Sequence, residues 1–301
     1  MSKLIKEHLS GFSHDLGDGF HVYRVLPPKS HRAVGPFVFM DHFGPVTMAA
    51  DKAMDVRPHP HIGLATVTYL WQGRIEHRDS LGNTQIIEPG DVNWMRAGRG
   101  IVHSERTAAE DRGKPQAMHG LQLWVALPLQ HEAGEPGFEH VAAAALPKLD
   151  INGVSGRLVA GTAYGSRSPV STQSELFYVD AHIPAGTELP LPDEHEQRAA
   201  YLIDGEVDAG DEALRERTLA VFAPGSGHVL KAKRDAHVVL LGGAPLDAPR
   251  YLWWNFVASS DERLQEARQA WQEKRYPMVA GDPEFIPLPG DNRANVRLTP
   301  E

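Results

Sequence analysis

The chain has 301 residues and a formal net charge of −9, and it contains 16 histidines but no cysteine. Its length suffices to bury two modest cores, and the lack of cysteine excludes disulfides, thiolate ligands, iron–sulfur clusters and cysteine nucleophiles. The negative charge disfavours direct binding to nucleic acid. No stretch approaches the roughly 18 apolar residues of a membrane span, and the N-terminus lacks the apolar core of a signal peptide, so we expect a cytoplasmic protein without membrane contact.

The first segment with chemical interest, residues 58–63, has the sequence PHPHIG. His59 and His61 are two apart, so in a β-strand they share one face. The prolines at 58 and 60 restrict φ and place this strand at a sheet edge or at its own start. The next run, residues 64–73, is rich in Thr, Val, Tyr, Leu and Trp and ends on glycine, which predicts a buried strand stopped by a turn.

A second pair, His103 and Glu105, lies in the segment GIVHSE at residues 100–105. The residues before it predict a Gly-Asn turn at 82–83, a strand at 84–88, a Pro-Gly-Asp turn at 89–91, a strand at 92–95 and a glycine-rich bend. Short strands every 8 to 12 residues, separated by turns, indicate an all-β sandwich or barrel. If the two paired segments are neighbouring strands, three imidazoles and one carboxylate converge on one point.

The second half of the chain repeats this character. Residues 130–156 mix glycine, proline and small residues and suit an interdomain connection. Strand-like segments then return at 157–165, 175–186, 198–207, 218–225 and 236–243. The last pattern, residues 259–276, is helical, with Ser259 or Ser260 as the N-cap and Leu264, Ala267 and Trp271 at a spacing that would cover a sheet face.

The order of these motifs resembles the paired motifs of the cupin superfamily. It consists of H-x-H, a glycine about ten residues later, P-G-D and a later histidine. The segments HPHIGLATVTYLWQG, GDVNWMRAGRGIVHSE and YLWWNFVASS are similar to the pirin family, and this resemblance covers most of the chain. The usual cupin glutamate would stand at Ala65, and Glu105 supplies a carboxylate instead. The resemblance implies His59, His61, His103 and Glu105 as metal ligands and points to iron. The donor types alone leave manganese, cobalt, nickel, copper and zinc open.

We therefore predict an all-β bicupin, with two tandem antiparallel β-barrels of jelly-roll type and a C-terminal helix. Residues 1–135 would form the metal-binding cupin domain. Residues 136–301 would form a cupin domain without a complete metal site, ending in the helix and a tail. Its single histidines, His195 and His228, are expected to be solvated rather than to bind metal.

The alternative for the four predicted ligands is that they are ordinary polar strand residues. Inside a barrel each unpaired polar group would cost about 1–3 kcal/mol, which favours a bound ion. Packing roles are expected for His77 and His119, and also for His42, although His42 could line the pocket. The residues that could orient ligands or close a cleft are Asp41, Arg99 and Gln122, with surface ion pairs as the alternative for Asp41 and Arg99.

Three neutral imidazoles and one carboxylate leave a divalent ion with a net charge of about +1 and one or two open positions. Such a centre attracts an anionic oxygen and favours loss of a phenolic proton. The pirin resemblance implies quercetin 2,3-dioxygenase activity, an oxidoreductase reaction of a flavonol or similar planar phenol with O₂, and Glu105 would be its catalytic base. The alternatives are a metal-binding regulatory protein that acts through a protein partner without turnover and, with less support, a metal-dependent sugar isomerase.

Overall fold

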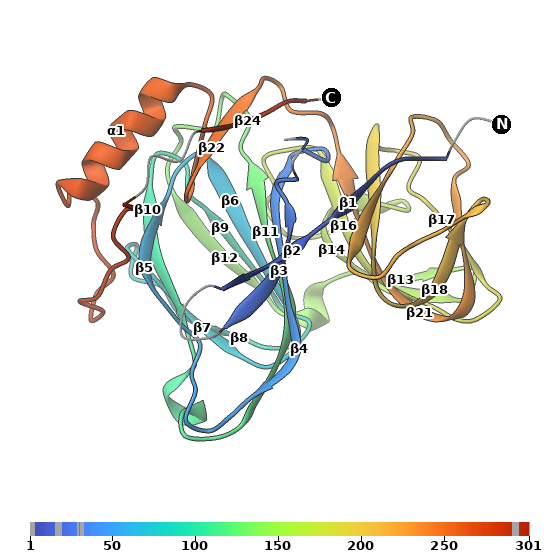
Figure 1. Cartoon of the computed structure of the whole chain (residues 1–301), viewed down its shortest axis with the longest axis horizontal. Helices are drawn as coiled ribbons and strands as arrows, with labels where there is room; N and C mark the ends of the chain where they lie inside the picture. Colours follow the sequence, from blue (N-terminus) through green and yellow to red (C-terminus); the bar gives the residue numbers. More distant parts are fainter. Residues whose placement is uncertain (1–3, 16–19, 29, 31–32, 291–294, 301) are drawn as a thin grey trace.

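The computed structural model describes residues 4–15, 20–28, 30, 33–290 and 295–300. Within these residues the chain is mostly β-strand and has one α-helix. Two β-rich units lie side by side, with the helix on the outer side of the N-terminal unit (Figure 1). The observed secondary structure therefore confirms the predicted all-β class.

In the described part of the chain, two sheets build the N-terminal unit. The larger has the order β12-β9-β6-β11-β4-β3-β2. Its strands are β2 (Phe12–Asp15), β3 (His21–Leu26), β4 (Phe37–Met48), β6 (Leu64–Gln72), β9 (Val92–Arg96), β11 (Gln116–Ala126) and β12 (Gly137–Val141). The smaller, in the order β5-β10-β7-β8, contains β5 (Asp55–His61), β7 (Ile75–Asp79), β8 (Thr84–Ile87) and β10 (Ile101–Arg106), and a 3-10 helix, η1 (Ala109–Asp111), precedes β11.

The C-terminal unit is one large antiparallel sheet with the main order β1-β20-β18-β21-β16-β14-β13. These strands are β1 (Ile5–Ser10), β13 (Lys148–Ile151), β14 (Val154–Ala163), β16 (Leu176–Ile183), β18 (Gln197–Ala209), β20 (Thr218–Phe222) and β21 (Val229–Gly243). Shorter additions are η2 (Ala143–Ala145), β15 (Ser166–Arg167), β17 (Glu188–Pro190) and β19 (Glu212–Ala213). The N-terminal strand β1 thus belongs to the second unit (Figure 1).

Side chains on the two faces of β16 pack into two different apolar cores. Phe177, Val179 and Ala181 pack into the apolar interior of the C-terminal unit. Tyr178 points to the other face and packs with Tyr69 and other residues of the N-terminal unit. Because side chains of a strand alternate between faces, one strand serves both an interior and an interface. The two units therefore share a continuous buried contact.

The C-terminal part of the chain returns to the first unit. Strands β22 (Arg250–Trp253), β23 (Phe256–Ala258) and β24 (Val296–Leu298) form a small sheet, and α1 spans Asp261–Gln272. The Ser260 side chain accepts a hydrogen bond from the Arg263 backbone N–H, which caps the helix. The predicted buried positions pack over Ile62 and Val102 beside the metal-site strands; they are Leu264, Ala267 and Trp271. The predicted helix, its cap and its covering role are confirmed.

Residues 130–156 are where the chain crosses between the units, because β12 pairs with β9 of the first unit and β13 pairs with β14 of the second. A domain boundary between residues 135 and 136 stays a prediction. Among the described residues no helix has the length and apolar character that a membrane crossing requires.

Candidate metal centre

Strands β5 and β10 bring the two predicted ligand pairs together. They are antiparallel neighbours, with His59 directly opposite His103. Strand β5 lies at the edge of its sheet, as the prolines at 58 and 60 predicted. Gly63, which follows the pair, has a φ of +67°, and a Cβ there would lie 2.0 Å from the Val257 carbonyl oxygen. Only glycine allows this close approach of β23 behind the ligand strand.

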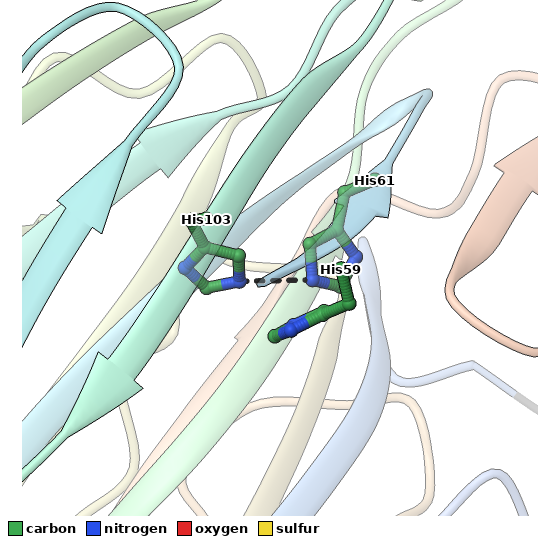
Figure 2. Close-up of side chains that lie close together, drawn as sticks. All are labelled: His59, His61 and His103. Carbon is green, nitrogen blue, oxygen red and sulfur yellow. Dashed lines mark hydrogen bonds between the residues drawn. The ribbon is translucent and has the colours of Figure 1, made fainter. Parts of the chain in front are cut away.

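The three histidines form a compact buried cluster (Figure 2). One ring nitrogen from each of His59, His61 and His103 lies within 4.8 Å of the other two. The Nε2 atoms of His61 and His103 are only 3.1 Å apart. The sequence prediction that these imidazoles converge is confirmed.

The outer nitrogen of each of the first two rings faces a backbone carbonyl. The Nδ1 atom of His59 is 2.8 Å from the Arg57 oxygen, and Nδ1 of His61 is 3.0 Å from the Asn255 oxygen. A carbonyl can only accept, so Nδ1 carries the proton in both rings and Nε2 is left with a lone pair.

The third histidine is oriented through a relay. His77 lies with its Nε2 3.0 Å from Asp79 Oδ2 and its Nδ1 3.4 Å from Nδ1 of His103. Hydrogen bonds from His77 and Asn83 hold the pKa of Asp79 below its ordinary value although burial alone would raise it. The carboxylate therefore accepts from His77, which in turn accepts from His103. The Nε2 of His103 is again left bare.

This pattern leaves the Nε2 atom of each histidine without a hydrogen, in a cluster where one ring nitrogen of each lies within 4.8 Å of the other two. Burial lowers the pKa of His59 to about 4 and the pKa values of His61 and His103 well below the ordinary 6.5, with neighbouring histidines adding to the shift. A 3.1 Å contact between the bare Nε2 atoms of His61 and His103 is repulsive unless a cation lies between them or one ring gives up its outer hydrogen bond. A divalent transition metal fits this donor set, since neutral imidazoles with anchored outer N–H groups are its usual ligands.

Glu105 lies in the same pocket but is held by other partners. Its carboxylate accepts from Gln122 Nε2 at 3.2 and 3.3 Å and from Thr68 Oγ1 at 3.2 Å. Burial raises the pKa of Glu105, while His77 and the hydrogen bonds from Thr68 and Gln122 oppose the shift. Among the described residues around this pocket, the atoms that lie mutually within 4.8 Å belong to the three histidines and not to Glu105. A ligand role for this carboxylate thus stays a prediction.

A pocket of about 440 Å³ opens over the histidines, and both sheets of the N-terminal unit line it. Its apolar walls include Phe20, Phe39, Phe43, Trp124 and Trp254. The rings of Phe39 and Trp124 are stacked with centroids 3.9 Å apart, and Trp124 also contacts the His61 ring. Phe39 and Phe43 also belong to apolar clusters of buried residues. Phe39 and Trp124 thus form a stacked pair beside the histidine cluster, with the Arg24 guanidinium 4.5 Å from the centroid of the Phe39 ring.

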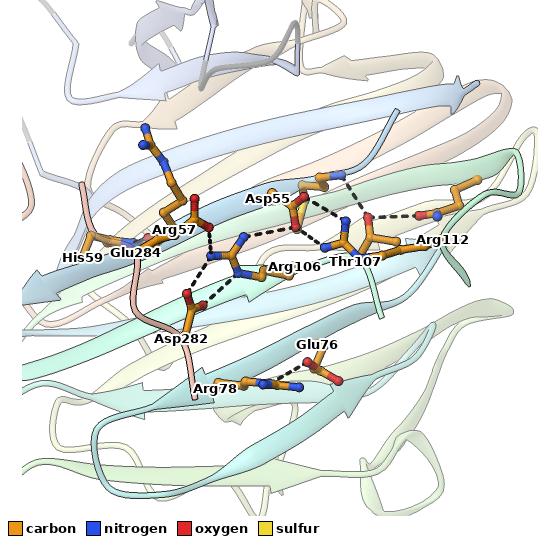
Figure 3. Close-up of polar contacts among 12 residues, drawn as sticks. Asp55, Arg57, His59, Glu76, Arg78, Arg106, Thr107, Arg112, Asp282 and Glu284 are labelled. Atoms are coloured by element: carbon orange, nitrogen blue, oxygen red, sulfur yellow. Dashed lines mark hydrogen bonds and ion pairs between the residues drawn. The ribbon is translucent and has the colours of Figure 1, made fainter. Parts of the chain in front are cut away.

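A strap from the C-terminal region closes one side of the pocket. Arg106 points away from the cluster and pairs with Asp282 and Glu284, at 2.8 and 2.7 Å, and with Asp55 at 3.4 Å (Figure 3). A few residues later the Ile286 N–H donates to the Pro58 carbonyl. Ile286 and its neighbouring prolines then line the pocket. The ligand strands β5 and β10 therefore hold the strap on both sides.

The other predicted residues have different roles. Asp41 accepts two hydrogen bonds of 2.8 Å from Arg24 at the pocket wall, and Gln122 orients Glu105. His42 packs at the interface between the units, where it contacts Tyr201 and His119 at 3.0 Å. Arg99 pairs with Glu135 on an exposed surface.

The expectation that His195 and His228 are solvated is wrong, because both are buried. His195 donates to the Thr162 carbonyl at 2.6 Å, and His228 lies 3.5 Å from the Arg198 guanidinium. Sequence reasoning also missed Asp79 as the end of the relay. Its signal was another pair at i and i+2, His77 and Asp79, which the structure places on β7.

Comparisons with known proteins agree with this geometry. The family model "Pirin" matches residues 19–125, and "Pirin C-terminal cupin domain" matches residues 178–277. A pirin-like protein of Caulobacter vibrioides is 47% identical over 91% of this chain and 96% of its own length. The crystal structure of quercetin 2,3-dioxygenase from Acinetobacter baumannii has a TM-score of 0.86 at 33% identity, covering 97% of this chain and 98% of that one.

A more distant structure, a bacterial pirin from Escherichia coli in complex with nickel(II), shares the fold with a TM-score of 0.62 at 16% identity, over 79% of this chain and 98% of that one. The two units are thus cupin domains, as the predicted bicupin required. The chain belongs to the pirin family.

Proposed function

We propose that this protein is an iron-dependent dioxygenase of the quercetin 2,3-dioxygenase type, which cleaves a flavonol with O₂. The metal ligands would be His59, His61, His103 and Glu105. The observation that carries the proposal is the set of three bare Nε2 atoms at the end of an apolar pocket. The relative from Acinetobacter baumannii that bears this activity in its name supports it.

The pocket suits a planar aromatic substrate. Its volume of about 440 Å³ lies within the range of about 300–1,000 Å³ that small-molecule sites occupy. Its aromatic walls provide apolar contacts for a ring system. The Arg24–Asp41 pair offers polar contacts on the wall. A flavonol bound against these walls would present its oxygens to the histidines.

Glu105 is the residue proposed to take the proton of the flavonol hydroxyl. Its carboxylate lines the pocket together with His59 and His61, so a substrate hydroxyl bound at these histidines would lie near it. Gln122 donates to both carboxylate oxygens and so fixes their orientation. When bound, iron would supply a Lewis acid that favours the phenolate and a redox centre for O₂ chemistry.

The donor set does not choose the metal by itself. Imidazole and carboxylate ligands bind several first-row ions, and the more distant pirin structure contains nickel(II). Iron is proposed because the pirin resemblance points to it. Nickel, manganese, cobalt, copper and zinc are the competitors to load in parallel.

The test is an anaerobic incubation of the iron-loaded protein with quercetin, followed by admission of O₂. We expect the flavonol absorbance to stay constant without O₂ and to fall after it is admitted. The His61→Ala protein, carried through the same loading, is the matched control and should show only the uncatalysed rate. If iron-loaded protein causes no O₂-dependent loss, the dioxygenase proposal fails and a regulatory role through a protein partner takes its place.

A further inference from the structure

A second group of metal-binding side chain types lies in the C-terminal unit. Asp180 and His182 are two residues apart on β16, and His237 on β21 stands directly opposite His182. Because residues two apart share a face and opposed residues lie side by side, all three side chains project from one face of the sheet. One ligand atom from each lies within 4.8 Å of the other two.

This face is not the apolar interior of the second cupin domain. It is the face that carries Tyr178 into the interface with the first unit. The Tyr69 hydroxyl donates to Asp180 Oδ2 at 3.0 Å, and the Trp71 ring contacts the His237 ring at 4.8 Å between centroids. The group therefore lies at the seam between the units, away from His195 and His228, where sequence reasoning looked for ligands.

Asp180 and His237 are arranged so that a cation can replace the proton between them. Asp180 Oδ1 lies 2.6 Å from His237 Nε2, so a proton bridges them. Two ligands bound at about 2.1 Å and at right angles would be about 3 Å apart, which a small side-chain rotation provides. His182 stacks on His237 with ring centroids 4.3 Å apart and brings a second imidazole. Metal binding would release the bridging proton.

The surroundings favour a divalent cation. A cavity of about 370 Å³ lies over His182 and His237, and Asp204, Asp235 and Ser155 also line it. These additional carboxylates make the cavity attractive to positive charge, and its open side has room for water ligands. On the neighbouring strand Arg157 stands opposite Asp180, but its guanidinium donates to the Ala143 carbonyl.

We propose that Asp180, His182 and His237 form a second binding site for a divalent transition metal. Two imidazoles and one carboxylate on one face, with open positions toward solvent, select ions such as Zn²⁺ or Fe²⁺. Tyr69 supports the site from the other unit by holding the carboxylate. An ion pair between Asp180 and His237 alone would require neither His182 nor the acidic cavity.

The test is the number of Zn²⁺ ions bound per chain after equilibrium dialysis of tag-free protein, measured by elemental analysis. The proteins are the wild type, His182→Ala, His61→Ala and the double variant. His182→Ala should remove one ion in both backgrounds, because the two sites share no ligand. His21→Ala, which removes an exposed histidine outside both groups, is the matched control and should remove none.

Calorimetric titration of the His61→Ala protein isolates the second site. Asp180→Asn should weaken Zn²⁺ there by more than about 100-fold, and Tyr69→Phe by about 10–100-fold, the usual effect of losing an outer hydrogen-bond partner. Unchanged stoichiometry or affinity in the His182→Ala protein would overturn the proposal. Loss of one ion with His182→Ala supports it even if the first site binds no Zn²⁺, so the two proposals fail separately.

Discussion

The two cupin domains differ in the surroundings of their buried histidines. In the N-terminal domain three imidazoles direct their N–H groups outward, to Arg57, Asn255 and His77, and leave bare nitrogens inside. In the C-terminal domain the interior is apolar. Its His228 lies beside the guanidinium of Arg198, a cation that the chain itself supplies. His195 of that domain also bonds to a backbone carbonyl, but the metal-binding groups found among the described residues include neither His195 nor His228. The difference therefore lies in the convergence of three imidazoles, which only the N-terminal interior shows within the described residues.

The largest expected effect separates these two interiors. His61→Ala should weaken metal binding at the first site by more than about 100-fold, because even the loss of an outer partner costs 10–100-fold, and flavonol turnover should vanish. His195→Ala removes a buried histidine from the other domain and should leave metal affinity and turnover unchanged. Metal content and turnover are measured on both. Equal losses of metal and turnover in the two variants would contradict the proposed difference between the two domains.

The next effect concerns the base. Glu105→Gln keeps the shape of the side chain but removes its basicity, so kcat for quercetin should fall by about 10²–10⁴-fold. The rate is measured at matched metal content. Glu76→Gln, at a carboxylate that pairs with Arg78 away from the pocket, is the control. Full turnover by a Glu105→Gln protein that keeps its metal would remove the residue from the mechanism.

The relay should have a smaller effect. Asp79→Asn weakens the acceptor that fixes His77 and, through it, His103, and should lower metal affinity by about 10–100-fold. Asp193→Asn breaks a corresponding pair with Arg198 in the other domain and should not change that affinity. The measurement is competition with a chelator of known affinity. An Asp79→Asn protein with wild-type affinity would show that the relay does not orient the ligand.

The last prediction concerns stability and not metal binding or turnover: it is the pH dependence of folding at the interface between the domains. Burial lowers the pKa of His42 to about 3, with smaller contributions from His119, Arg217 and His237. Burial lowers the pKa of His119 to about 4, with smaller contributions from His237 and Arg217. Between these values and the unfolded value of about 6.5 the unfolded chain binds more protons, so stability should fall as pH drops through this window, with at most about 1.4 kcal/mol per pH unit for each histidine.

Urea unfolding of metal-free protein at pH 7, 6, 5 and 4 measures this slope. His42→Gln should reduce it by the share of one histidine. A slope that His42→Gln leaves unchanged would show that His42 titrates alike in the folded and unfolded chains.

The ligand pairs could be predicted because their information is local. Residues two apart share a strand face, and His59, His61 and His103 needed only one strand pairing to meet. Pro58 and Pro60 likewise indicated that β5 lies at a sheet edge. The helix followed from its cap and the spacing of its apolar residues.

The remaining parts of the site depend on contacts that no local pattern contains. The Asn255 carbonyl that fixes His61 lies 194 residues away in sequence. The strap reaches Arg106 from Asp282 through a tertiary ion pair. Asp180 and His182 did form a recognisable i and i+2 pair, but their partner His237 could be identified only from the register of β16 and β21.

The central claim is that three bare Nε2 atoms of the N-terminal domain hold the metal. Anomalous diffraction at the iron edge, from crystals loaded with Fe²⁺ without oxygen, tests it most directly. The account predicts a peak about 2.1 Å from Nε2 of His59, His61 and His103, with their Nδ1 atoms still bonded to Arg57, Asn255 and His77, whether or not a second peak lies at Asp180, His182 and His237. A peak elsewhere with none between these rings, or coordination through Nδ1, would contradict it.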